Sequence, residues 1–125
     1  MRLSSAIKKG CEGTTKLQKQ YFNKEAFIEK EIKACCSLGA AMKSLLEENN
    51  VLPGDLKALE LLVNTYKFLG YKPNTRKDKI PKLLCGCNNY GLDIFSCITH
   101  MNDSHNFSRE EIACWVENLE NLYME

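Results

Sequence analysis

The chain lacks the long apolar runs that membrane proteins need. No run in its 125 residues approaches the roughly eighteen apolar residues of a spanning helix. Its first residues, MRLSSAIKKGCEG, also lack the apolar core of about seven residues that a secretion signal requires. We therefore expect a protein that remains inside the cell, in the cytoplasm.

A surplus of charge of one sign is missing as well. The 17 Lys and Arg residues nearly balance the 16 Asp and Glu residues, for a net charge of +1. The whole chain thus offers no electrostatic argument for nucleic acid or for an acidic partner. With 44% hydrophobic and 26% charged residues, the composition is that of a soluble globular protein of one domain.

Common catalytic signatures are absent too. The sequence contains no glycine-rich phosphate loop, no HExxH pair and no dinucleotide-binding fingerprint. A cysteine nucleophile, Cys87 or Cys97 with His100 or His105 as its base, is the remaining option. No glycine-rich turn presents such a thiol, and an i, i+3 pair on one helix has no oxyanion donors beside it. We predict that the protein is not an enzyme and needs no cofactor.

Apolar residues recur every three or four positions, and no stretch alternates for long enough to form a strand. This pattern predicts an all-α fold, a compact bundle of about five to six helices with a kinked first helix. We expect residues 1–22 to be a basic, loosely ordered segment and residues 23–125 to form a single helical-bundle domain. The predicted helices cover residues 24–49, 55–69, about 80–87, 92–102 and 109–124.

The predicted first helix has Asn23 as its N-cap and an apolar stripe that includes Phe27, Ile28 and Ile32. Its small residues, Cys35 to Gly39, are the expected position of the kink or break. The helix should end at the Asn49-Asn50 turn.

The last helix has the clearest start signal. Ser108 and Glu111 have the spacing of a capping box, in which each side chain accepts a hydrogen bond from the other's backbone amide. Trp115 lies in the middle of the apolar stripe that follows, so we expect it in the core.

Seven cysteines without a secretion signal are predicted to be reduced and mostly buried. Cys85, Cys87, Cys97 and His100 could instead form a zinc site, since Cys97 and His100 lie at i, i+3 on one predicted helix. However, the single residue between Cys85 and Cys87 is shorter than the usual spacing of two to four. We therefore favour core cysteines and keep zinc as the alternative.

Charge is distributed unevenly along the chain. Between Tyr66 and Lys82 there are six cationic side chains and one acidic one, whereas Ser108 to Glu125 contains five acidic side chains and Arg109. Complementary surfaces of this kind orient protein pairs, so we expect a protein partner, either a copy of this chain or a related helical domain. The predicted partner-binding residues are Lys72, Arg76, Lys77, Lys79, Lys82, Glu110, Glu111 and Glu117. The alternative is a nucleic-acid-binding module that uses the basic run 67–82.

The stretch from Ala41 to Leu69, with Leu45-Leu46-Glu47-Glu48-Asn49 and Pro53-Gly54-Asp55-Leu56, resembles the helix pairs of death-fold domains, particularly death effector domains. Residues 92–119 resemble a second such pair, and residues 80–98 align with the fourth and fifth helices of caspase recruitment domains. A recruitment-domain order uses residues 24–49 and 55–69 as its first two helices and is the order we prefer. The charged RxDL-type signature of death effector domains is absent. The resemblance implies a non-catalytic adaptor or decoy that pairs with death-fold domains in apoptotic or innate immune signalling.

Overall fold

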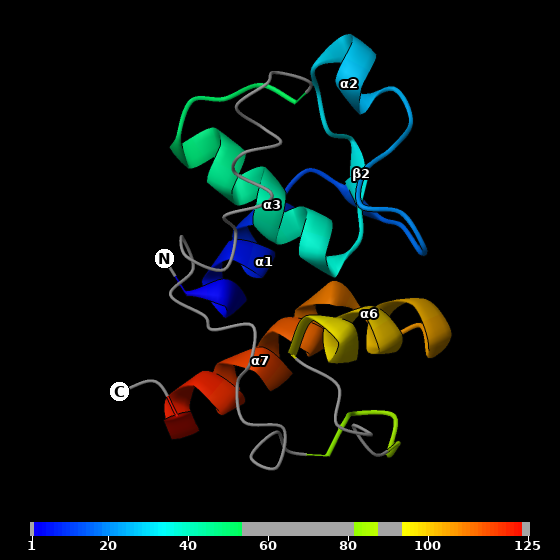
Figure 1. Cartoon of the computed structure of the whole chain (residues 1–125), viewed down its shortest axis with the longest axis vertical. Coiled ribbons are helices and arrows are strands. Elements are labelled where there is room, and N and C mark those ends of the chain that lie inside the picture. Colours follow the sequence, from blue (N-terminus) through cyan, green and yellow to red (C-terminus); the bar gives the residue numbers. More distant parts are fainter. Residues whose placement is uncertain (1, 54–81, 88–93, 124–125) are drawn as a thin grey trace.

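The computed structural model describes residues 2–53, 82–87 and 94–123 (Figure 1). This part of the chain is mostly helical with one short strand pair, which is compatible with the all-α prediction. Among these residues, no helix is both long and apolar enough to cross a membrane. The predicted helix over 55–69 lies outside the described residues. The elements are α1 (Leu3–Cys11), β1 (Thr15–Lys16), α2 (Ala26–Glu29), β2 (Ala34–Cys35), α3 (Ser37–Glu48), α6 (Ile94–Ser104) and α7 (Arg109–Tyr123).

Helix α1 occupies the middle of the fold, where it packs against both α3 and α7 (Figure 1). The prediction of a loosely ordered segment is therefore wrong for these residues, since Leu3, Ala6 and Ile7 are completely buried. Small residues allow the close approach: a Cβ added to Gly10 would lie 1.8 Å from the carbonyl oxygen of Ala40 on α3. Gly10 is therefore a packing contact between two helices.

The single kinked helix predicted over residues 24–49 does not form. Residues 24–36 contain only the four-residue helix α2 and the strand β2, which pairs in parallel with β1 in the register Thr15 to Ala34. Asn23 does not cap a helix, because its side-chain oxygen accepts hydrogen bonds from the Lys33 and Ala34 amides at 2.9 and 3.2 Å. Phe27 and Ile28, which we placed on the buried stripe, are 51% and 85% exposed.

The break predicted between Cys35 and Gly39 coincides with the start of α3. Cys36 is the N-cap residue of this helix, and its sulfur accepts a hydrogen bond from the Gly39 amide at 3.3 Å. Leu45 and Leu46 are buried. The helix ends at the predicted turn, where Asn50 takes a positive φ of 56°.

Helices α6 and α7 match the sequence predictions closely. Ile98 and Met101 of α6 are fully buried. At the start of α7 the capping box is formed: the Ser108 amide donates to Glu111 Oε1 at 3.1 Å and the Glu111 amide donates to Ser108 Oγ at 3.0 Å. Trp115 is 6% exposed, which confirms its place in the core.

Two buried polar side chains hold the ends of these helices together. Asn102 accepts hydrogen bonds from the Ser37 amide and hydroxyl at 3.1 and 2.8 Å and donates to the Leu17 carbonyl at 2.9 Å. Arg109, only 5% exposed, donates to the Thr14 carbonyl at 2.7 Å and to the Cys35 carbonyl at 3.3 Å. They supply the hydrogen bonds that buried backbone groups require, and so fix α6 and α7 against the strand pair.

Candidate metal centre

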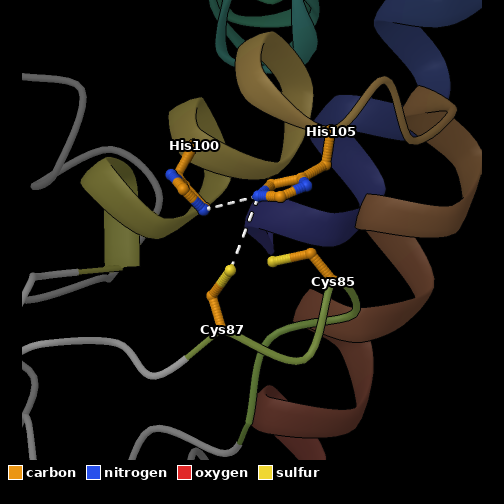
Figure 2. A group of neighbouring side chains, drawn as sticks. All are labelled: Cys85, Cys87, His100 and His105. Carbon is orange, nitrogen blue, oxygen red and sulfur yellow. Dashed lines mark hydrogen bonds between the residues drawn. The ribbon is translucent and has the colours of Figure 1, made fainter.

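Four potential metal ligands converge at one end of α6. Figure 2 shows the side chains of Cys85, Cys87, His100 and His105 pointing toward one another. Their ligand atoms all lie within 4.8 Å of each other. Cys85, Cys87 and His100 are half-buried, and His105 is exposed. Two thiols and two imidazoles are a donor set that zinc prefers.

The two cysteines sit on a turn that is anchored to the core. The described segment 82–87 is not the helix that we predicted around 80–87. Instead, the Gly86 amide donates to the Leu83 carbonyl at 2.9 Å, and Gly86 has a φ of 81°, which favours glycine. Leu83 is 3% exposed, and the Trp115 indole donates to the Lys82 carbonyl at 3.1 Å. The turn therefore has a fixed position relative to α7.

The two histidines come from the last turns of α6 and the residue that follows. His100 lies within the helix, and His105 comes directly after its final residue, Ser104. The chain folds back there, because Asn106 has a φ of 54° and the Phe107 amide donates to the Met101 carbonyl at 3.3 Å. The imidazole rings lie edge to face with their centroids 4.7 Å apart.

Distances within the cluster are close to those of a tetrahedral zinc site. The Nε2 atoms of His100 and His105 are 3.0 Å apart, and Cys87 Sγ is 3.5 Å from His105 Nε2. Zinc–nitrogen bonds of about 2.05 Å and zinc–sulfur bonds of about 2.3 Å place two nitrogens about 3.3 Å apart, and a sulfur about 3.6 Å from a nitrogen. All four ligand atoms lie within 4.8 Å of one another. This limit is about 1 Å wider than the longest ligand–ligand distance of such a site, which is about 3.8 Å between two sulfurs. Side-chain rotations could close that gap.

The pKa of Cys87 differs from that of an activated nucleophile. A hydrogen bond with Cys85, together with partial desolvation, raises the pKa of the Cys87 thiol above its usual value. Reactive cysteines usually have a lowered pKa, and the 3.5 Å contact between Cys87 Sγ and His105 Nε2 does not lower the pKa of Cys87 here. A bound zinc ion would remove the thiol protons, because only the thiolate is a ligand.

The zinc alternative considered from the sequence named three of the four cluster residues, whereas the favoured interpretation was core cysteines. Cys97 does not belong to the cluster, because its position on α6 places it in the core with no exposed surface. His105 takes its place, although we considered it only as a catalytic base. The signal was present in the sequence: twelve residues separate Cys87 from His100, and four separate His100 from His105. Both spacings are those of Cys2His2 zinc sites, and only the Cys85–Cys87 gap is unusually short.

The predicted partner-binding residues are only partly described. Lys72, Arg76, Lys77 and Lys79 lie outside the described residues, while Lys82, Glu110 and Glu111 are exposed. Two of the acidic residues already have partners within the chain, since Glu111 belongs to the capping box and Glu117 pairs with Lys8 of α1. These contacts reduce the acidic charge that α7 has available for a second molecule.

Comparisons with protein-family models, curated proteins and solved structures give no match for this chain. The cluster must therefore be interpreted from its own geometry.

Proposed function

We propose that this protein is a small helical module whose working site binds one zinc ion through Cys85, Cys87, His100 and His105. The observation that carries the proposal is the convergence of two thiols and two imidazoles within 4.8 Å. The ligands come from two parts of the chain that are each held in place by other contacts: the turn by Leu83 and Trp115, and α6 by its buried face. Such a site is largely preorganised before metal arrives.

Four protein ligands complete the tetrahedral coordination of zinc. No position remains for water or substrate, which is the arrangement of structural zinc sites rather than catalytic ones. The ion would cross-link the turn at residues 85–87 to the end of α6. We therefore propose a structural role, and the prediction that the protein is not an enzyme stays in place.

The charge of α6 gives no support to a DNA-reading role for this Cys2His2 set. In zinc fingers that bind DNA, the helix carrying the histidines enters the major groove. Here α6, with the sequence IFSCITHMNDS, contains no Lys or Arg that could contact phosphates. Of the basic run 67–82, the described part contains only Lys82. Nucleic-acid binding therefore gains no support from the described residues.

The death-fold adaptor function stays a prediction, and so does the death-fold bundle. Its preferred helix order needs one kinked helix over residues 24–49, which the strand β2 interrupts. Most of the predicted basic surface lies outside the described residues. Pairing with a copy or a related helical domain through that surface is compatible with a zinc-bound module.

Cobalt and zinc titrations of the reduced full chain test the proposal. After chelator treatment and its removal, Co²⁺ should give the intense visible bands of tetrahedral coordination with thiolate ligands, and Zn²⁺ should displace it at one ion per chain. Cys87→Ser and His105→Ala should each weaken Zn²⁺ binding at least about tenfold. Cys114→Ser, a matched change at an exposed cysteine of α7, should leave the affinity unchanged.

Circular dichroism of each variant establishes that its helices remain. Absence of the tetrahedral cobalt spectrum in the parent chain would refute the site. So would equal zinc affinities of the parent, Cys87→Ser and His105→Ala proteins.

A further inference from the structure

The cluster contains two sulfurs on residues only two positions apart, and this arrangement suggests regulation of the site. We propose that the cluster is a redox-sensitive clasp, in which a hydroperoxide oxidises Cys85 and Cys87 to a disulfide and so releases the metal ion. This inference depends on the proposed function, because the ion to be released is the zinc of that site.

The turn between the two sulfurs can accommodate the new bond. Gly86 has no side chain, and no atom lies within 4 Å of the position that its Cβ would take. The two sulfurs belong to one cluster, whose ligand atoms all lie within 4.8 Å of one another. Forming a disulfide requires the sulfurs to approach to about 2.05 Å, which a short glycine turn with free space around it permits.

Accessibility separates this pair from the buried cysteines. Cys85 and Cys87 are half-buried, whereas Cys35 and Cys97 have no exposed surface and Cys36 is 8% exposed. A small peroxide therefore reaches the cluster sulfurs more readily than it reaches the core thiols. Exposed Cys114 is also accessible, but it does not belong to the cluster and its oxidation would leave all four zinc ligands intact.

The reaction balances without electrons from the metal, because zinc has no accessible redox chemistry. One thiolate attacks a peroxide oxygen, the O–O bond breaks, and a sulfenic acid forms with release of hydroxide. The second thiolate attacks the sulfenic sulfur and displaces its hydroxide. The two thiolates have then lost two electrons to the peroxide, and two protons from solvent convert the two hydroxides to water.

The product cannot hold the ion. A disulfide carries no thiolate, so the zinc loses two of its four ligands and keeps only the two imidazoles. Loss of zinc removes the cross-link between the turn at residues 85–87 and α6. A dithiol reductant restores both thiols and allows zinc to bind again.

Hydrogen peroxide treatment of the zinc-loaded full chain, with a colorimetric zinc chelator present, tests the clasp. Zinc content is measured first, and this step tests the proposed function independently. On oxidation we expect one zinc ion released per chain, loss of two thiols, and a mass decrease of two hydrogens that peptide mapping locates between Cys85 and Cys87. Dithiothreitol followed by zinc should restore the original metal content, and Cys114→Ser should behave in the same way.

Outcomes distinguish the two proposals. A chain that never takes up zinc overturns both. Zinc that binds but stays bound after accessible thiols have been oxidised overturns the clasp and leaves the metal site standing. Zinc release accompanied by sulfinic acids, or by a disulfide at another cysteine pair, also overturns the clasp.

Discussion

Trp115 connects the core to the turn that carries Cys85 and Cys87. Two replacements of this residue should separate the contributions of packing and of one hydrogen bond to the free energy of unfolding. The side chain is 6% exposed within α7, and its indole N–H donates to the Lys82 carbonyl at 3.1 Å. Trp115→Ala removes both the packing and the hydrogen bond. Trp115→Phe removes the hydrogen bond but keeps most of the buried apolar surface.

The expected magnitudes differ clearly. Truncation of a buried aromatic residue to Ala costs about 3–5 kcal/mol, because the surrounding side chains fill the cavity only in part. A net hydrogen bond contributes about 0.5–1.5 kcal/mol. Lys82 is exposed, so water can replace the indole as the donor to its carbonyl. The free energy of unfolding lost in Trp115→Phe should therefore lie in the smaller range of a single hydrogen bond. The free energy of unfolding of a small domain is only about 5–15 kcal/mol, so Trp115→Ala removes a large share of it.

Urea unfolding followed by circular dichroism measures both changes, and a chelator keeps zinc from contributing. Asn118→Ala, at an exposed position of the same helix, is the control and should change the unfolding free energy by less than about 0.5 kcal/mol. A Trp115→Ala protein as stable as the parent would show that α7 is peripheral. A Phe variant that loses as much as the Ala variant would show that the hydrogen bond outweighs the packing.

Three further predictions concern residues away from the cluster. Asn102→Ala should lower the unfolding free energy by about 2–6 kcal/mol, because the Ser37 amide and the Leu17 carbonyl each lose a buried partner worth about 1–3 kcal/mol; a loss below about 1 kcal/mol in urea unfolding would contradict this. Gly10→Ala should cost about 1–3 kcal/mol by forcing α1 away from α3, whereas Ser5→Ala on the exposed side of α1 should be nearly neutral; equal thermal midpoints for the two variants would contradict the close contact. Burial raises the pKa of the Cys11 thiol from 9.0 to about 11. The free energy of unfolding that the buried, protonated thiol contributes is therefore fully present below pH 9 and is lost as the pH rises through 11. Urea midpoints of Cys11→Ala should therefore fall less steeply over this range than those of the parent, and identical slopes would refute the assignment.

Local signals in the sequence predicted α6 and α7 well. The capping box at Ser108 and the stripe through Trp115 depend on residues within one or two turns of each other. The break before α3 was also predicted from local residues, although Cys36 proved to be a helix cap rather than the centre of a kink.

Elements that depend on distant partners were not predictable in this way. The strand pair consists of two residues on each side, too short to show alternation, and each strand exists because the other lies beside it. Helix α1 looked like part of a basic lead-in because residues 1–22 carry five positive side chains and one negative one. The role of Gly10 in packing can be recognised only once Ala40 of α3 is known to lie against it.

The candidate site lies between these two cases. The spacing of Cys87, His100 and His105 is a local pattern that the sequence contains. We grouped Cys97 with His100 because both belong to α6, but residues three positions apart on a helix are about 60° apart around its axis. In the structure that difference separates a core residue from a half-buried one.

The central place of α1 has a consequence for the synthesis of the chain. Its apolar face is covered by α3 and by α7, and α7 begins at Arg109, some hundred residues later. At a translation rate of about 5–20 residues per second, α1 must wait roughly 5–20 s after leaving the ribosome before its second partner is made. During that interval Leu3 and Ile7 are incompletely covered, so the nascent chain is most vulnerable to aggregation and to proteases before α7 emerges.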